Sequence, residues 1–119
     1  MKKLFVIGFV LILSSCGKTS ATLEHVSSNG KVKINITGSR PMATEAWQVV
    51  MKVKSYNFKE QELVFEVNAS DINKETVSFK WENENNCLII FKQSDNSSRI
   101  FSLLASPSEF ELRHVSDNP

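Results

Sequence analysis

Apolar and polar residues alternate along most of the chain beyond residue 30. Val32, Ile34 and Ile36 each stand between polar neighbours, and the same period of two recurs further along the chain. This period places successive side chains on opposite faces of a strand, so each segment is expected to bury one face and expose the other. The expected strands cover residues 31–37, 47–54, 62–67, 77–82, 87–91, 99–105 and 109–114.

Turn-forming residues separate these segments. Residues 83–86 and 94–98 are rich in Asn and Ser, which is typical of hairpin connections, and Pro41 and Pro107 lie in further breaks. No helical period is sustained. About seven short strands with such breaks predict an all-β domain, either a small antiparallel β-sandwich or a barrel. Segment 87–91 is apolar at both phases of the alternation, so we expect it in the middle of a sheet.

The first residues of the chain follow a different pattern. Lys2 and Lys3 precede an uninterrupted apolar run over residues 4–13, and Ser14 and Ser15 follow it. A basic start, a short apolar stretch and small residues are the three parts of a secretory signal. The run is too short for a membrane-spanning helix, which needs about 20 apolar residues.

A cysteine at the end of this segment makes the signal more specific. Leu13-Ser14-Ser15-Cys16 resembles the lipobox of bacterial lipoproteins, in which an aliphatic residue and two small residues precede an invariant cysteine. The resemblance implies cleavage before Cys16, a diacylglyceryl thioether on its sulfur and acylation of the new amino terminus. Two or three acyl chains anchor a protein stably, whereas one chain holds it marginally. The alternatives are an ordinary signal peptide cut near Ser14 or Ser15, and a buried helix with an unmodified thiol.

These features divide the chain into four parts. We expect a signal peptide over residues 1–15, a lipidated Cys16 with a flexible tether over 16–30, a β domain over 31–115 and a tail over 116–119. A tether is expected because most of its residues are small or polar. In enterobacterial lipoproteins an Asp after the cysteine retains the protein at the inner membrane. Gly17 stands there, so the resemblance implies anchoring in the outer membrane, facing the periplasm.

The charge balance argues against some partners. Loss of Lys2 and Lys3 with the signal reduces the 14 basic residues to 12, against 13 acidic ones, so the net charge changes from +1 to about −1. Nucleic-acid binding and a polybasic membrane patch both need clustered Lys and Arg. We therefore expect no nucleic acid, and a membrane contact made through the lipid anchor. Once Cys16 is lipidated, Cys87 has no disulfide partner, and its apolar neighbours predict a small buried side chain.

Catalytic chemistry has little support in the sequence. The two histidines are His25, in the expected tether, and His114, at the end of the last expected strand. No serine lies in a Gly-x-Ser-x-Gly elbow, and no Cys or His spacing suits zinc. We therefore expect no enzyme, no metal and no cofactor, with a small hydrolase as the least favoured function.

Binding is the remaining class of function, and loops held by a rigid sheet are its expected place. Segment 39–45 contains Arg40, Pro41 and Met42 and leads into Trp47, and Arg, Met and aromatic residues are enriched at interfaces. These four are the candidate binding residues, unless the segment is an ordinary connection between strands. The expected function is a lipid-anchored, non-catalytic binding or scaffold module with a protein partner in the envelope. The alternative is a protective inhibitor or immunity lipoprotein directed against an enzyme or toxin.

Overall fold

Eight strands make up the described part of the chain. A computed structural model describes residues 19–118, with side chains described for residues 20–115. The strands are β1 (Thr19–Val26), β2 (Val32–Arg40), β3 (Trp47–Ser55), β4 (Gln61–Val67), β5 (Val77–Trp81), β6 (Asn86–Lys92), β7 (Ser98–Ala105) and β8 (Phe110–Asn118). Within these residues, no helix is long and apolar enough to cross a membrane.

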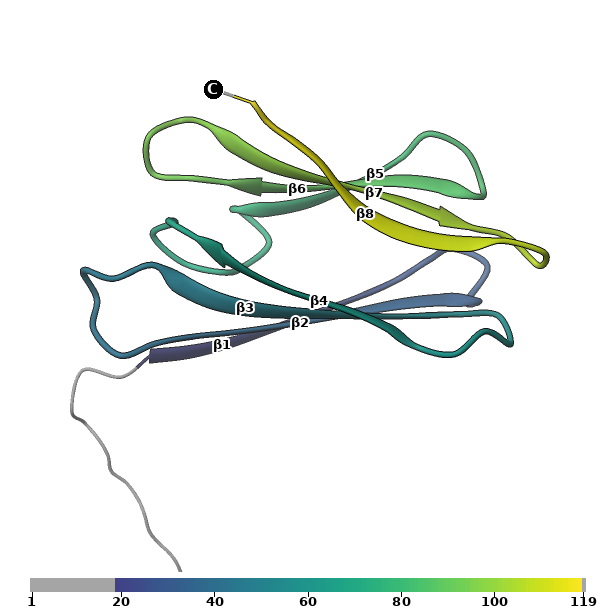
Figure 1. Cartoon of the computed structure of the whole chain (residues 1–119), viewed down its shortest axis with the longest axis horizontal. Coiled ribbons are helices and arrows are strands. Elements are labelled where there is room, and N and C mark those ends of the chain that lie inside the picture. The colour runs from purple at the N-terminus through teal and green to yellow at the C-terminus, as the bar shows by residue number, and fades with distance from the viewer. Residues whose placement is uncertain (1–18, 119) are drawn as a thin grey trace, which may run out of the picture.

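The strands form two four-stranded antiparallel sheets. Strand order follows the chain in both sheets, β1-β2-β3-β4 in the first and β5-β6-β7-β8 in the second. The two sheets pack as layers, one above the other (Figure 1). The predicted all-β fold is therefore confirmed, in the form of a small β-sandwich. β6 is an inner strand of the second sheet, as the apolar segment 87–91 predicts.

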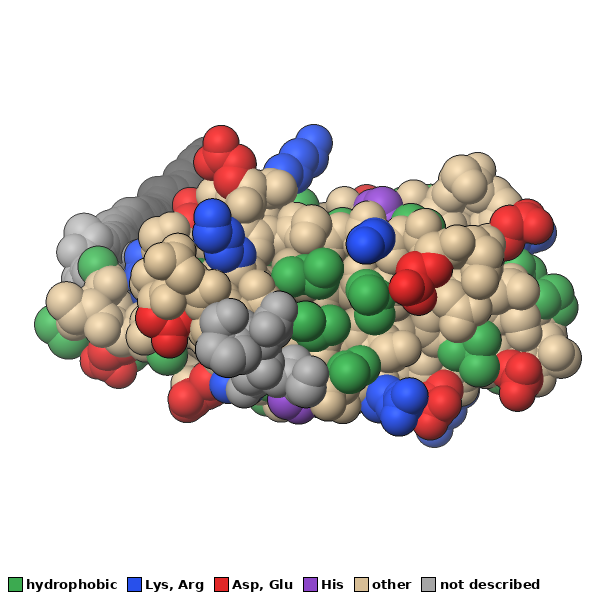
Figure 2. Space-filling view, turned by 90° about the horizontal axis from the view of Figure 1, so that it is seen from above, with side chains coloured by type: hydrophobic (Ala, Val, Ile, Leu, Met, Phe, Trp, Pro, Cys, Tyr) green, Lys and Arg blue, Asp and Glu red, His purple; other side chains and the backbone are tan. Residues whose placement is uncertain are grey.

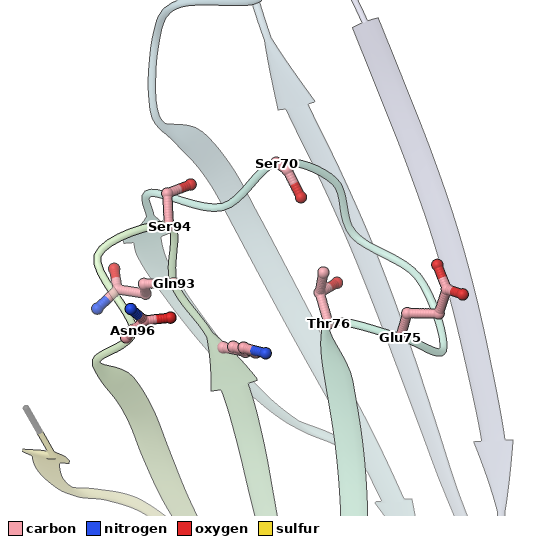
Figure 3. A pocket seen from close by; sticks show the side chains of 7 residues that line it. Ser70, Glu75, Thr76, Gln93, Ser94 and Asn96 are labelled. Atoms are coloured by element: carbon pink, nitrogen blue, oxygen red, sulfur yellow. The ribbon is translucent and has the colours of Figure 1, made fainter.

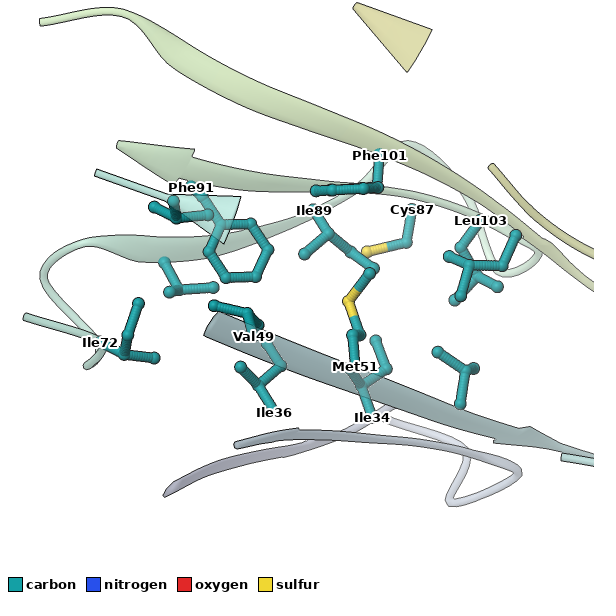
Figure 4. Close-up of a cluster of buried hydrophobic side chains, with 14 of the residues drawn as sticks. Ile34, Ile36, Val49, Met51, Ile72, Cys87, Ile89, Phe91, Phe101 and Leu103 are labelled. Atoms are coloured by element: carbon teal, nitrogen blue, oxygen red, sulfur yellow. The ribbon is translucent and has the colours of Figure 1, made fainter. Parts of the chain in front are cut away.

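The hydrophobic core lies between the sheets and consists mainly of inward strand residues, with Ala69 and Ile72 added from the connection between the sheets. Ile34, Met51, Ile89 and Leu103 are fully buried, with two of these residues on each sheet (Figure 4). Aromatic side chains also connect the layers. The Phe65 ring on β4 has its centroid 5.1 Å from that of Phe91 and 4.4 Å from that of Phe101, which lie on β6 and β7. These separations are typical of favourable aromatic pairs.

The structure differs from the predicted flexible tether. Residues 19–26, which fall within that tether, form β1, and its register on β2 pairs Thr19 with Arg40 and Val26 with Lys33. Leu23 and His25 are half-buried while Glu24 between them is exposed, so β1 does alternate. Its contrast is weak because its remaining side chains are mostly small. The predicted domain boundaries are too narrow at both ends, since β8 also continues to Asn118. The signal segment and Cys16 lie outside the described residues.

All connections lie at one of two ends of the sandwich. β1 begins at the end that also holds residues 41–46, 68–76 and 93–97, and we call this the proximal end (Figure 1). The turns of residues 27–31, 56–60, 82–85 and 106–109 lie at the opposite end, which we call the distal end. Segment 68–76 carries the chain from the first sheet to the second.

Candidate functional site

The predicted binding loop lies at the proximal end, beside the start of β1. Met42 is 56% exposed, and Pro41 is exposed too. Both side chains can therefore contact another molecule. The binding role of the loop stays a prediction. The contacts of Arg40 and Trp47 within the fold limit which of the four candidate side chains can take part in binding.

Trp47 is fully buried at the start of β3. Its indole N–H donates a hydrogen bond to the carbonyl oxygen of Ala69 at 3.1 Å. On β2, a Cβ placed on Gly38 would come within 3.0 Å of the Trp47 ring, so glycine provides the space that this ring occupies. Trp47 therefore connects the first sheet to segment 68–76, and its side chain is not available to a partner.

The Arg40 side chain lies over the Trp47 ring and contacts both loop 41–46 and segment 68–76. Its guanidinium carbon lies 4.5 Å from the centroid of that ring, a cation–π geometry. Its two terminal nitrogens donate to the carbonyl oxygens of Ala43 at 3.0 Å and Ser70 at 3.2 Å. Arg40 is thus half-buried and joins loop 41–46 to segment 68–76, so its guanidinium is engaged within the fold.

A polar depression of about 450 Å³ opens at the proximal end between segment 68–76 and the β6–β7 turn (Figure 3). Its lining includes Gln93 and Ser94, whose polar groups hold the turn together. The Gln93 side chain accepts from the Asn68 backbone N–H at 3.1 Å and donates to the Ser97 hydroxyl at 2.9 Å. The Ser94 N–H donates to the Asn68 carbonyl at 2.8 Å. Since these groups are engaged within the loops, the depression is a weak candidate for a ligand site.

The outward face of the second sheet carries a concentration of aliphatic side chains. We define the apolar patch as four outward residues of β6 and β7 together with an exposed residue of β8: Leu88, Ile90, Ile100, Leu104 and Val115. Ile90 lies directly opposite Ile100 in the β6–β7 register, and Val115 is 48% exposed. Hydrophobic side chains gather near the middle of this face, with charged side chains around them (Figure 2).

Two basic residues flank the apolar patch in one cross-strand row. Lys80 on β5 lies opposite Leu88, and Arg113 on β8 lies opposite Ser102. Along the next row towards the distal end, Glu111 lies opposite Leu104. The patch is therefore apolar at its centre and carries charges of both signs at its border.

Sequence reasoning did not select this face, although a signal for it was present. The apolar residues at both phases of segment 87–91 predicted an inner strand. An inner position in a sheet covers the edges of a strand but not its outward face. Leu88 and Ile90 therefore stay half-buried, and we regard the apolar patch as the strongest candidate binding surface.

His25 lies on β1, an edge strand of the first sheet, and contacts β5, an edge strand of the second sheet. Its ring is stacked on that of Phe79 with centroids 4.1 Å apart and an interplanar angle of 3°. The Trp81 indole N–H donates to His25 Nε2 at 3.0 Å, so this nitrogen is an acceptor and the imidazole is neutral. Burial lowers the pKa of His25 from its usual 6.5. The sequence had placed this residue in a solvated tether.

Residues 19–118 contain few side chains that could act as a nucleophile or bind a metal ion. Cys87 is 1% exposed, and its burial raises the pKa of the thiol to about 12, so a reactive thiolate is disfavoured. Over this described range, no group of three or more His, Cys, Asp or Glu side chains is placed to hold a metal ion.

No family model, curated protein or solved structure matches this chain.

Proposed function

We propose that this protein is a lipid-anchored, non-catalytic binding module of a bacterial envelope, and that another protein docks on its apolar patch. Leu13-Ser14-Ser15-Cys16 supports the anchor. The observation that carries the binding proposal is the aliphatic character of the outward positions on β6 and β7, the two inner strands of the second sheet.

A sheet face that stays in water is expected to be polar, because antiparallel strands then alternate between apolar inward and polar outward residues. Contiguous apolar surface on a small protein marks an interaction site more often than isolated exposed residues do. Covering Leu88, Ile90 and Ile100 would remove apolar surface from water, which contributes about 25 cal/mol for each Å² buried.

The charges at the border indicate the chemistry of the partner. Lys80 and Arg113 flank the apolar patch in one row, and Glu111 lies at its border in the next row. These charges favour a partner surface that is apolar at its centre, acidic beside Lys80 and Arg113, and basic beside Glu111. Such border charges direct the orientation of docking more than they increase affinity.

The test compares two matched pairs of substitutions in the full-length lipidated protein, cross-linked in its own envelope and analysed by mass spectrometry. Ile90→Ser with Ile100→Ser changes a cross-strand pair in the apolar patch. Val50→Ser with Val64→Ser changes a cross-strand pair on the outward face of the first sheet. We expect the first double variant to lose the cross-linked partner and the second to retain it, with both still folded by circular dichroism.

Equal cross-linking by the two double variants would exclude the apolar patch as the docking site. Cross-linking only to a second copy of the chain would overturn the proposal of a different partner. The nature of a captured partner separates the two functions considered: a resident envelope protein indicates a scaffold, and an incoming enzyme or toxin indicates an inhibitor.

A further inference from the structure

We infer that loop 41–46 contacts the membrane and holds the proximal end of the sandwich against the bilayer. This inference rests on the proposed lipidation of Cys16. It assigns the loop a lipid surface as its partner and separates it from the protein-binding face of the second sheet.

Few residues separate the proposed anchor at Cys16 from the first described strand. β1 begins at Thr19, three residues after Cys16. An extended chain spans at most about 3.6 Å per residue, so the Cα atoms of these two residues are at most about 11 Å apart. A flexible tether of about 14 residues would instead have a root-mean-square reach of about 20 Å. A lipidated Cys16 therefore keeps the proximal end close to the lipid headgroups.

The second step is the strand register at that end. Thr19 lies opposite Arg40, which is the last residue of β2. The chain that leads back to Cys16 and the chain that leads on to Met42 therefore leave the first sheet at neighbouring positions. Among the three proximal loops, 41–46 is the one that follows directly from the strand paired with β1.

The third step is the chemistry of the proximal loops. Glu45 is the only charged residue of loop 41–46. Among the side chains that the structure describes, Met42 is the exposed large hydrophobic one that lies in a loop rather than a strand. Segment 68–76, by contrast, contains Asp71, Lys74 and Glu75. The corner nearest the anchor thus carries fewer charged residues than segment 68–76. A flexible Met side chain there can enter the boundary between headgroups and acyl chains, where interfacial segments insert about 5–10 Å.

Arg40 contributes by holding the loop in shape. Its hydrogen bonds to Ala43 and Ser70 fasten loop 41–46 to segment 68–76, so Met42 projects from a braced loop. Less conformational entropy is then lost when the loop meets the membrane. With this end on the bilayer, the strands lead away from the lipid surface, and the apolar patch faces sideways, where a neighbouring protein can reach it.

The experiment uses the lipidated protein in vesicles of phosphatidylcholine with a brominated phosphatidylcholine as quencher. Met42→Cys carries an environment-sensitive fluorophore at the proximal end, and Asn57→Cys carries the same fluorophore in an exposed turn at the distal end. Cys87 is 1% exposed and does not compete for the label, and Cys16 is blocked by lipid. We expect a blue shift and bromine quenching for the label at position 42 and neither effect for the label at position 57.

A third variant excludes insertion caused by the fluorophore itself. Glu45→Cys is labelled with Met42 intact or with Met42→Asp, and quenching at position 45 should decrease in the Met42→Asp protein. Flotation with the vesicles reports lipid anchoring independently. If the protein does not float, the proposed anchor is wrong. If it floats while positions 42 and 57 respond alike, or if Met42→Asp has no effect, the membrane contact of loop 41–46 is overturned and the anchor stands.

Discussion

The outward faces of the two sheets differ in the residues that their strands place opposite one another. On the first sheet, Lys33 forms an ion pair with Glu24 at 3.2 Å, and the Gln48 amide donates to Glu66 at 2.7 Å. On the second sheet, the inner strands β6 and β7 pair Ile90 with Ile100, whereas the inner strands β2 and β3 of the first sheet pair Asn35 with Lys52. The first face thus carries mostly polar pairs, with one aliphatic pair, Val50 and Val64, whereas several aliphatic side chains lie half-buried together on the second.

Polar and aliphatic pairs on an outward face contribute to the protein in different ways. Exposed polar pairs such as Lys33 and Glu24 contribute between about 0 and 1 kcal/mol each, so the polar face provides solubility more than stability. Aliphatic pairs with similar exposure contribute favourable free energy mainly when a partner covers them and removes their apolar surface from water. The inward faces of the two sheets, in contrast, share one core and should respond alike to substitution.

The largest effect is expected in that shared core. Trp47→Ala on the first sheet and Phe91→Ala on the second both remove fully buried side chains. Each should lower the free energy of unfolding by about 3–5 kcal/mol, which combines lost burial with an unfilled cavity. Chemical denaturation of the two variants checks this. A loss below about 1 kcal/mol in only one of them would mean that the two inner faces are not equivalent.

A smaller effect is expected where segment 68–76 joins the sheets. Arg40→Ala removes the cation–π contact with Trp47 and two hydrogen bonds to backbone carbonyls, and should lower the free energy of unfolding by about 1–2 kcal/mol. Arg40→Lys keeps the charge without the planar fork and should recover only part of this loss. Thermal melts of both variants provide the measurement. An unchanged melting temperature in Arg40→Ala would show that these Arg40 contacts contribute nothing to stability.

The His25 contact should make the stability of the sandwich depend on pH. The pKa of His25 is lowered in the folded protein, so between that value and 6.5 the unfolded chain binds the proton more readily. Stability is therefore complete above pH 6.5 and decreases as the pH falls from 6.5 through the lower folded pKa. Protonated Nε2 can no longer accept the hydrogen bond from Trp81.

Melts over pH 4.5–7.5 can separate His25 from the other histidine. His25→Phe keeps an aromatic ring against Phe79 and should remove the part of the stability loss below pH 6.5 that comes from His25. His114→Gln should retain that loss. The same pH profile in His25→Phe as in the original protein would contradict the assignment.

The smallest effect is expected on the outward face of the first sheet. Lys33→Ala breaks an ion pair whose side chains are both about half exposed, and the free energy of unfolding should change by less than about 1 kcal/mol. High salt should reduce even this difference. A larger cost, measured by urea denaturation, would show that the polar face is structural and would weaken the contrast with the second sheet.

Several features could be predicted from the sequence because they depend on near neighbours. The period of two identified the inward residues of β2 to β5, including Ile34, Met51 and Phe79, since side chains on a strand must alternate. β1 escaped prediction because its small residues give little contrast, and Leu23 and His25 are recognisable as inward only once β2 lies beside them.

The candidate sites show why the remaining features could not be predicted. Arg40 and Trp47 were selected by residue type, but their partners Ser70 and Ala69 lie more than twenty residues further along the chain. Sequence spacing does not show such contacts. For the same reason, the sequence does not show that Phe58 pairs with Phe110, whose ring centroid lies 5.8 Å away.

The sequence by itself determined the alternating strands, the all-β class and the lipobox-like segment, because each is written in consecutive residues. Tertiary structure alone decided that Ile90 and Ile100 meet on one outward face, and that β1 brings the start of the fold within three residues of Cys16. Strand order and register create these neighbours. A pattern of alternation states which face a side chain occupies but not what stands beside it there.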